Sequence, residues 1–117
     1  MTLAQIVFEK KKLEKRYGVE GRVAGHYVEA GYHVTMKFPT PNGEVSFVAK
    51  KGGELIAVDV LSGTITVGAK QVDDIASKAA AIKAKPVLAL YGAGPVVSEE
   101  AKKAASEKGV AIRRFRG

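Results

Sequence analysis

The chain has no cysteine among its 117 residues and only two histidines, His26 and His33. Without thiols it forms neither disulfides nor thiolate metal sites. Neither histidine has a partner at zinc-ligand spacing, so the sequence does not indicate a zinc centre. The lack of cysteine also fits a reducing compartment.

Long apolar runs are missing too, and no stretch approaches the length that crosses a membrane. The N-terminus MTLAQIVFEKKKLEKR puts a short apolar start before a basic run, the reverse of the order in a secretory signal. We therefore expect a cytoplasmic protein with no membrane partner.

Nucleotide-binding motifs are absent as well. The loop YGAGPVVSEE departs from G-x-G-x-x-G at Val97 and lacks the Lys-Ser/Thr of a P-loop. An ordinary loop before a helix capped by Ser98 is the better interpretation. We expect no bound cofactor and no small-molecule substrate.

Acidic residues are the scarcer charge, 12 against 19 Lys and Arg, which gives a net charge of +7. Hydrophobic residues make up 46% and charged residues 26%, as in an ordinary folded protein, so residues 1–117 are predicted to form a single domain. The basic excess favours an anionic partner, nucleic acid above all, with a lysine-rich solubilising surface as the alternative.

Two helices are predicted at the start of the chain. Apolar residues recur at helical spacing over residues 3–16 with lysines on the other sides, so residues 1–16 form a basic amphipathic helix. Gly18 is expected to interrupt the helical pattern, which then continues to Gly31. The internal glycines Gly21 and Gly25 either weaken the second helix or mark close packing.

Three strands follow, because the apolar period changes to two in YHVTMKF, EVSFVAK and ELIAVDV. The turns PTPNG and KKGG join them into an antiparallel meander. One face of the first strand is predicted to carry Tyr32, Val34, Met36 and Phe38. In the second strand, one face is predicted to carry Glu44, Ser46 and Val48, and the other Val45, Phe47 and Ala49.

The rest of the chain alternates helices and strands. A helix is predicted over 72–83, and the nearly all-apolar run KPVLALYG is predicted to be a strand covered on both faces. A further helix is predicted to begin after the cap Ser98 and to end at Gly109, and VAIRRF is predicted to be the last strand. The order ααβββαβαβ predicts an α/β fold with one mixed sheet flanked by helices. KPVLALYG should lie parallel to ELIAVDV within it.

Asp59 is the one acid inside ELIAVDV after its first residue. Because an unpaired buried carboxylate is costly, it must be solvated, paired or bound to a cation. The hairpin register brings Ser46 near it, and Glu20 could approach from the preceding helix. The alternative for Asp59 and for Glu44 is a solvated or lysine-paired strand residue.

The stretch GEVSFVAKKGGELIAVDVLSG resembles the PD-(D/E)xK, or restriction-endonuclease-like, superfamily. In that family a strand reading like G-E-x-D-x-x-A is joined by a hairpin to a strand ending in (D/E)-x-K. The likeness covers roughly residues 17 to 116 and includes the small archaeal Holliday-junction resolvases. It implies a restriction-endonuclease-like sheet, a nucleic-acid partner and a homodimer, since resolvases pair two subunits across a two-fold junction.

Residue by residue, the resemblance implies a degenerate active site. Glu20 matches the helix acid, Asp59 the strand acid and Gln71 the polar residue of the crossover helix, whereas Ser46 replaces the first metal-binding Asp and Leu61 the lysine. Serine is a poor Mg²⁺ ligand and leucine cannot orient a water. We expect a nucleic-acid-binding protein that has lost catalysis and holds no metal.

Other functions stay open. An active endonuclease could hold Mg²⁺ or Mn²⁺ on Asp59 and Glu44, with Lys70 or Lys50 as the cation. The chain could instead be a structural or regulatory subunit that contacts an active paralogue or a repair complex.

A ribonuclease site of the His-Tyr-Lys type is a further alternative. It would use His26 or His33, Tyr27 or Tyr32, and a lysine, and nothing in their spacing singles it out.

Basic residues cluster on the first helix, at the KKGG turn, on the crossover helix and at the C-terminus, where they are predicted to contact phosphates. The expected partner is DNA, including branched DNA, or structured RNA. The predicted contact residues are Lys10, Lys11, Lys12, Lys15, Arg16, Lys50, Lys51, Lys70, Arg113, Arg114 and Arg116.

Overall fold

A computed structural model describes residues 1–117. The elements are α1 (Leu3–Tyr17), α2 (Val19–Glu29), β1 (His33–Thr40), β2 (Gly43–Lys51), β3 (Glu54–Ser62), β4 (Thr66–Val67), α3 (Ala69–Ala81), β5 (Lys85–Tyr91), β6 (Val96–Val97), α4 (Glu99–Lys108) and β7 (Ala111–Phe115). The predicted order ααβββαβαβ is confirmed, with β4 and β6 as short additions in the loops. No helix is long and apolar enough to span a bilayer.

The main sheet has five strands in the order β1-β2-β3-β5-β7. β1, β2 and β3 form the predicted antiparallel meander, and β5 pairs parallel to β3 as expected. β7 pairs parallel to β5 on its other side, and β4 and β6 form a separate parallel pair. The mixed α/β sheet predicted from the sequence is therefore confirmed.

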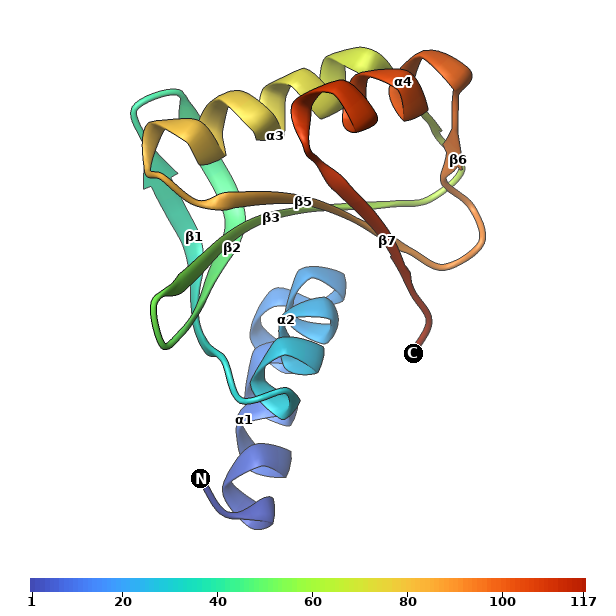
Figure 1. The fold of residues 1–117 in the computed structure, drawn as a ribbon. Coiled ribbons are helices and arrows are strands. Elements are labelled where there is room, and N and C mark those ends of the chain that lie inside the picture. Colours follow the sequence, from blue (N-terminus) through green and yellow to red (C-terminus); the bar gives the residue numbers. More distant parts are fainter.

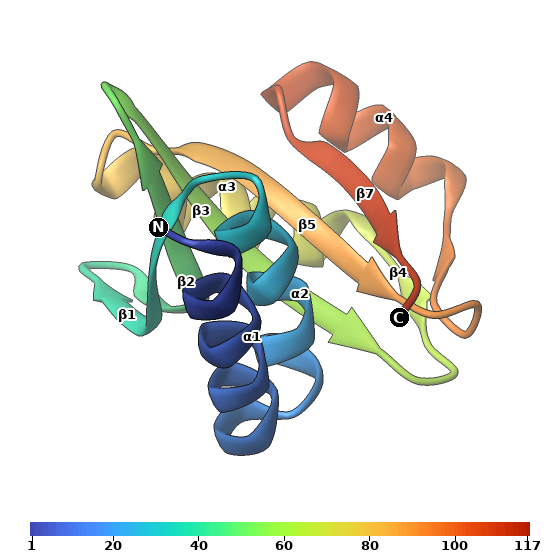
Figure 2. The ribbon, with the colours of Figure 1, turned by 90° about the horizontal axis from the view of Figure 1, so that it is seen from below.

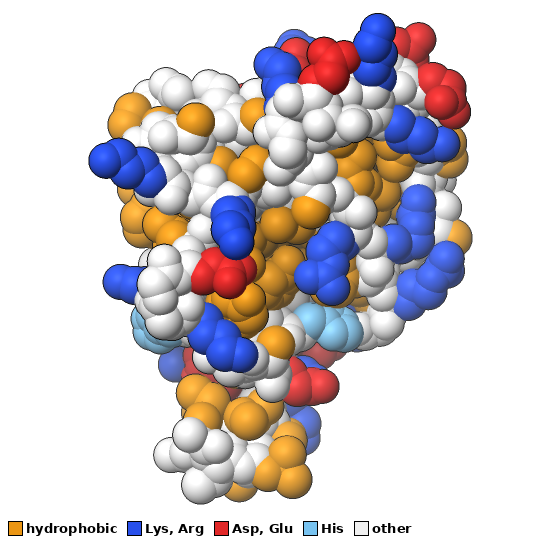
Figure 3. Space-filling model, viewed as in Figure 1, with side chains coloured by type: hydrophobic (Ala, Val, Ile, Leu, Met, Phe, Trp, Pro, Cys, Tyr) orange, Lys and Arg blue, Asp and Glu red, His pale blue; other side chains and the backbone are white.

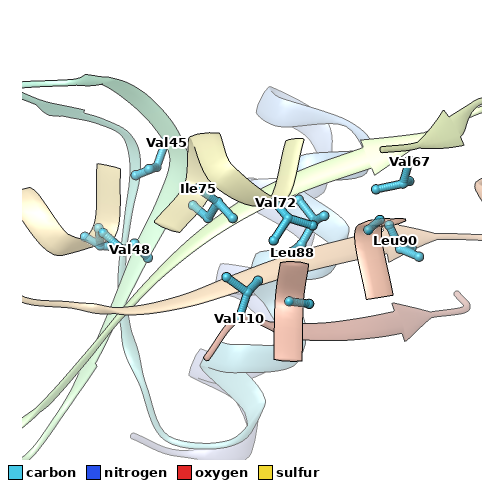
Figure 4. Close-up of a cluster of buried hydrophobic side chains, with 12 residues drawn as sticks. Val45, Val48, Val67, Val72, Ile75, Leu88, Leu90 and Val110 are labelled. Carbon is cyan, nitrogen blue, oxygen red and sulfur yellow. The ribbon is translucent and has the colours of Figure 1, made fainter. Parts of the chain in front are cut away.

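Helices cover both faces of this sheet. α3 and α4 lie above it and α1 and α2 below it, with the N-terminal part of α1 projecting away from the sheet (Figure 1). The upper core contains Leu88 and Leu90 of β5 together with Ile75 of α3 (Figure 4), and the lower core contains Val87 and Ala89. β5 is thus buried on both faces, as its apolar run predicted, and each fully buried Leu or Ile contributes about 1.5–3 kcal/mol.

Both strands of the first hairpin change face partway along their length. Val34 and Met36 of β1 pack in the lower core, but Phe38 packs in the upper core; in β2, Phe47 faces the lower core while Val45 joins the upper one. The strict alternation predicted for Phe38 and Val45 is therefore wrong.

The change occurs at Lys37, whose φ of 52° is left-handed. The ladder pairs Met36 with Phe47 and Phe38 with Val45, while Lys37 and Ser46 between them are not paired. A left-handed residue interrupts the period of two, which no hydrophobic pattern reveals. As a result the far end of the hairpin reaches up beside α3 (Figure 1).

α1 and α2 pack closely because Gly21 has no side chain. Gly18, with φ of 60°, ends α1 and lets α2 fold back along it. A Cβ atom at Gly21 would overlap with the backbone carbonyl of Leu13, whereas one at Gly25 would meet only the flexible stem of Lys10 at 3.3 Å. Close packing, one of the two predicted reasons for these glycines, is thus what Gly21 provides.

We predict that Gly21→Ala destabilises the protein although alanine is the better helix former by about 1 kcal/mol. The added methyl group forces the helices apart, and such overpacking costs about 1–3 kcal/mol. Urea denaturation measures the effect.

Gly25→Ala is the matched control, because the Lys10 side chain can move away. It should leave the free energy of unfolding unchanged or raise it by up to about 1 kcal/mol. Equal stability of the two variants would contradict the close contact at Gly21.

Candidate functional site

The structure brings Ser46 and Asp59 together where the ladder between β2 and β3 ends. The last backbone pair in this direction is Phe47 with Val58. Beyond it, the Ser46 amide donates to Asp59 Oδ1 at 3.0 Å, and the Val60 amide donates to Ser46 Oγ at 3.0 Å. Side chains thus replace the next rung of the ladder, and the predicted proximity of the two residues is correct.

The other carboxylate oxygen of Asp59 is held by a lysine that sequence reasoning missed. Lys78 Nζ lies 2.7 Å from Asp59 Oδ2 and 3.0 Å from Asp74 Oδ2, and it donates to the Glu44 carbonyl oxygen at 3.0 Å. An ammonium has three donors, so three oxygens satisfy it fully. We call Asp59, Lys78, Asp74 and the Glu44 carbonyl the lysine cluster.

Lys78 is buried, and burial disfavours the charged form of a lysine. That desolvation is opposed by hydrogen bonds to Asp59 and Asp74 and by their negative charges, which together raise the pKa of Lys78 above its ordinary value. Lys78 is therefore a cation at neutral pH. It supplies a positive charge beside Asp59, the residue that matches the metal-binding strand acid of the restriction-endonuclease-like family.

α3 positions Lys78 by the ordinary geometry of a helix. Asp74 and Lys78 are an i, i+4 pair on one side of α3, and Val72, Ile75 and Ala79 bury the same helix in the upper core. Lys78 lies three residues after Ile75, on the predicted apolar stripe. A lysine within such a stripe was the available signal for a buried partner acid.

The hairpin end is fixed to the same stretch of helix. Asn42 Nδ2 donates to Ser77 Oγ at 2.9 Å and to the Ser77 carbonyl oxygen at 3.2 Å. A Cβ on Gly43 would touch the Lys78 stem at 3.3 Å, and Gly43 also has φ of 129°. The lysine cluster thus connects β2, β3 and α3.

The other residues of the predicted site do not join Asp59. Glu20 forms an ion pair with Lys37, and Gln71 Oε1 accepts a hydrogen bond from the Gly68 amide, which caps α3. Leu61 packs against the upper core, and Glu44 is exposed and contributes only its carbonyl. Nowhere do three or more His, Asp or Glu side chains converge as a metal site would require.

Three of the predicted phosphate-contacting residues have partners within the protein. Lys10 pairs with Glu29, Lys51 donates to the Ala30 carbonyl oxygen at 2.9 Å, and Arg114 donates to the carbonyl oxygens of Gly92 and Pro95. The others are exposed and form no ion pair. These are Lys11, Lys12, Lys15, Arg16, Lys50, Lys70, Arg113 and Arg116.

The alternative ribonuclease combination is only partly assembled. His26, Tyr27 and Tyr32 lie around one hollow, whereas His33 is outside it. The Lys51 ammonium lies 5.4 Å from the centre of the Tyr32 ring, but it donates its hydrogen bond to the Ala30 carbonyl oxygen. His26 Nε2 is 2.8 Å from the Gly117 carbonyl oxygen.

We predict that Lys78→Met and Asp59→Asn each lower the free energy of unfolding by about 3–5 kcal/mol, because the first leaves the partly buried Asp59 carboxylate without a cation and the second leaves the buried Lys78 ammonium with the exposed Asp74 as its one counter-ion. The double variant should lose less than the sum of the two, which a double-mutant cycle in urea measures. The pH dependence provides a second measurement. The stabilisation from charged Lys78 is complete below the unfolded lysine pKa of about 10.4 and is lost as pH rises through the higher folded pKa.

Lys70→Met is the matched control, since Lys70 is exposed on the same helix and should change stability by less than about 0.5 kcal/mol. Single variants that behave like this control, with additive effects, would show that the cluster is solvated and weak.

Comparison with protein-family models and with curated proteins gives no match. Solved structures that resemble the chain include a repair endonuclease from Pyrococcus abyssi, with 16% identity and a TM-score of 0.63 over 92% of this chain and 46% of that one. Pyrococcus furiosus SfsA in complex with Ca²⁺ has 16% identity and a TM-score of 0.60 over 91% of this chain and 57% of that one. A protein of unknown function, AF1548, has 18% identity and a TM-score of 0.62 over 79% of this chain and 54% of that one. The chain spans about half the length of these proteins. At such identities the likeness concerns the fold: the chain has a mixed α/β fold, five strands flanked by helices, which is compatible with a nuclease-like fold.

Proposed function

We propose that this protein binds nucleic acid through its basic surface and that the lysine cluster holds the fold together without cleaving the bound strand. The fold supports the general role, because part of a repair endonuclease has a similar fold. DNA, including branched DNA, is the partner that the resemblance to junction resolvases favours, with structured RNA as the alternative.

The observation that carries the proposal is that eight of the eleven predicted contact residues are exposed and have neither an ion-pair nor a hydrogen-bond partner within the protein. Four of them, Lys11, Lys12, Lys15 and Arg16, follow one another along α1. Lysines with free ammonium groups can neutralise phosphates and release counterions, which is the main source of affinity for nucleic acid. Residues already paired within the protein, such as Lys10 and Arg114, contribute less.

The lysine cluster supports the absence of hydrolysis. Both oxygens of Asp59 are in use, and a divalent cation at Asp59 would have to displace or approach the buried Lys78 ammonium, which repels it. Ser46 and Leu61 supply neither a carboxylate nor a water-orienting cation. Each missing catalytic group removes a few kcal/mol of transition-state stabilisation.

One observation favours the second candidate, an active metal-dependent endonuclease. Lys78 puts an ammonium 2.7 Å from Asp59, so an acid and a lysine are adjacent in space although Leu61, and not a lysine, stands two residues after Asp59 in the sequence. Asp74, which is exposed, would be the second carboxylate in place of the expected Glu44. Neither Lys70 nor Lys50, the cations expected from sequence, is bonded to Asp59.

For a protein partner we infer a second copy of this chain, as the resemblance implies, with an active paralogue or another subunit of a repair complex as the alternative. The first turns of α1 carry exposed apolar side chains, among them Leu3, Val7 and Phe8. These turns of α1 project below the sheet (Figure 1), and apolar side chains are exposed at that end of the molecule (Figure 3). They form the surface that such pairing would bury.

The test is binding of labelled junction, duplex, single-stranded DNA and hairpin RNA, followed by fluorescence anisotropy over a range of salt. We predict salt-dependent binding that the triple variant Lys11→Gln, Lys12→Gln, Lys15→Gln weakens. If all three contact phosphate, the slope of log affinity against log salt falls by about 2.7, since each contact contributes about 0.9 on duplex DNA. The same samples with Mg²⁺ or Mn²⁺ should show no cleavage.

The control is the triple variant Lys83→Gln, Lys85→Gln, Lys103→Gln, which removes equal charge from exposed residues outside the predicted set. It should keep the larger slope. No binding at low salt would refute the proposed function, and metal-dependent cleavage lost in Asp59→Asn would establish the second candidate instead.

A further inference from the structure

The lower face of the molecule contains a hollow that the lysine cluster does not explain. It has a volume of about 350 Å³ and lies between the end of α2, the start of β3 and the strand β7. α1 and α2 lie in front of β2 and β3 and leave much of β7 uncovered (Figure 2). In Figure 3 an apolar floor is visible there, with side chains of both charges and a histidine around it.

Aromatic rings form much of the wall. Tyr27 contacts Tyr32 edge-on at 5.6 Å between ring centres, and its ring is 6.1 Å from that of Phe115. Behind it, Tyr27 packs on Phe47 at 5.4 Å. His26, 5.3 Å from Phe115, closes one side. Such surfaces suit a flat aromatic ligand, because every nucleobase has faces that stack on aromatic rings.

Tyr27 is also the one side chain in the protein that has a buried polar atom without a hydrogen-bond partner. The residue lines the hollow and is 5% exposed; its Oη is buried and has no hydrogen-bond partner, although Arg113 lies close enough to influence the pKa of the hydroxyl. A buried hydroxyl left unsatisfied is rare and unfavourable. Burial is the main cause that raises the pKa of Tyr27, and the nearby Arg113 opposes it, so the phenol stays protonated and offers a donor.

Groups of opposite charge lie on the rim. Arg113 and Glu54 both line the hollow, and no ion pair joins them. Glu54 Oε1 accepts a long hydrogen bond of 3.4 Å from the Tyr32 hydroxyl, and the Arg113 guanidinium lies 5.7 Å from the centre of the Phe115 ring. A simple anion would be repelled by Glu54 and a simple cation by Arg113. A neutral heterocycle with both donors and acceptors on its edges satisfies both.

Among the bases, guanine has the matching edges. Its O6 and N7 accept a pair of hydrogen bonds from an arginine, and its N1–H and N2–H can donate together to a carboxylate. A base reaches such a hollow only when it is unpaired and out of the stack. We propose that the hollow takes up one unpaired guanine of a bound strand, stacked on its aromatic wall, with Arg113 and Glu54 reading its edges. The inference rests on the proposed function and specifies its ligand.

The test compares fully paired duplexes with duplexes that carry one bulged nucleotide, either G, A, C, T or an abasic site, in anisotropy titrations at fixed salt. The bulged G should bind about ten-fold tighter than the abasic bulge, since stacking is worth about 1–3 kcal/mol per base. Glu54→Gln should remove the preference for G over A, and Tyr27→Phe should weaken G binding several-fold.

Glu107→Gln is the matched control, because it removes one negative charge from an exposed residue of α4 and should keep the preference for G. Thermal melts verify that Tyr27→Phe is folded. Equal binding of bulged, abasic and paired duplexes would overturn the guanine site while leaving the proposed function standing. No binding of any nucleic acid would overturn both.

Discussion

The buried ammonium of Lys78 is the interaction on which the arrangement of the upper half depends. A charged lysine away from water needs an acceptor for each of its three donors, and here the acceptors come from three elements: Asp59 on β3, the Glu44 carbonyl on β2, and Asp74 on α3 itself. The sheet and the helix are therefore held in one relative position. Removing a single partner leaves a buried charge, whereas a well-packed apolar replacement of the whole cluster need not destabilise the fold.

The cluster also depends on the change of face in the first hairpin. If β2 alternated strictly, Val45 would face the lower core with Phe47. The left-handed Lys37 and the unpaired Ser46 turn the end of the hairpin toward α3, and Ser46 then connects to Asp59 and Val60 through its own amide and hydroxyl. Ser46 thus occupies the position where a nuclease would need a carboxylate. Its hydrogen bonds to Asp59 and Val60 connect β2 and β3 where the backbone pairing has ended.

Much of the fold could be predicted from the sequence because it is recorded in local patterns. The all-apolar KPVLALYG, the Ser98 cap and the terminating Gly109 each have a short-range cause, and each is found as expected. The change of face at Phe38 depends on one backbone angle, and the partner of Asp59 lies 19 residues further along the chain, so neither has a short-range signal. The proximity of Ser46 and Asp59 followed from the register of a hairpin. Among the predicted contact residues, Lys10, Lys51 and Arg114 have partners within the protein. This could not be predicted from the sequence, because those partners are distant in the chain.

The two faces of the sheet thereby acquire different roles in the proposed function. The upper face is closed by α3 and α4 and stabilised by the lysine cluster, while the lower face has α1 with its lysines and the aromatic hollow beside β7. Paramagnetic NMR with Mn²⁺ tests the central claim, that Lys78 takes the place of a metal beside Asp59, most directly. The account predicts that the amide signals of Ser46 and Val60 broaden no faster than those of other residues as Mn²⁺ is added. Selective loss of these two signals at low Mn²⁺, absent in Asp59→Asn, would contradict it.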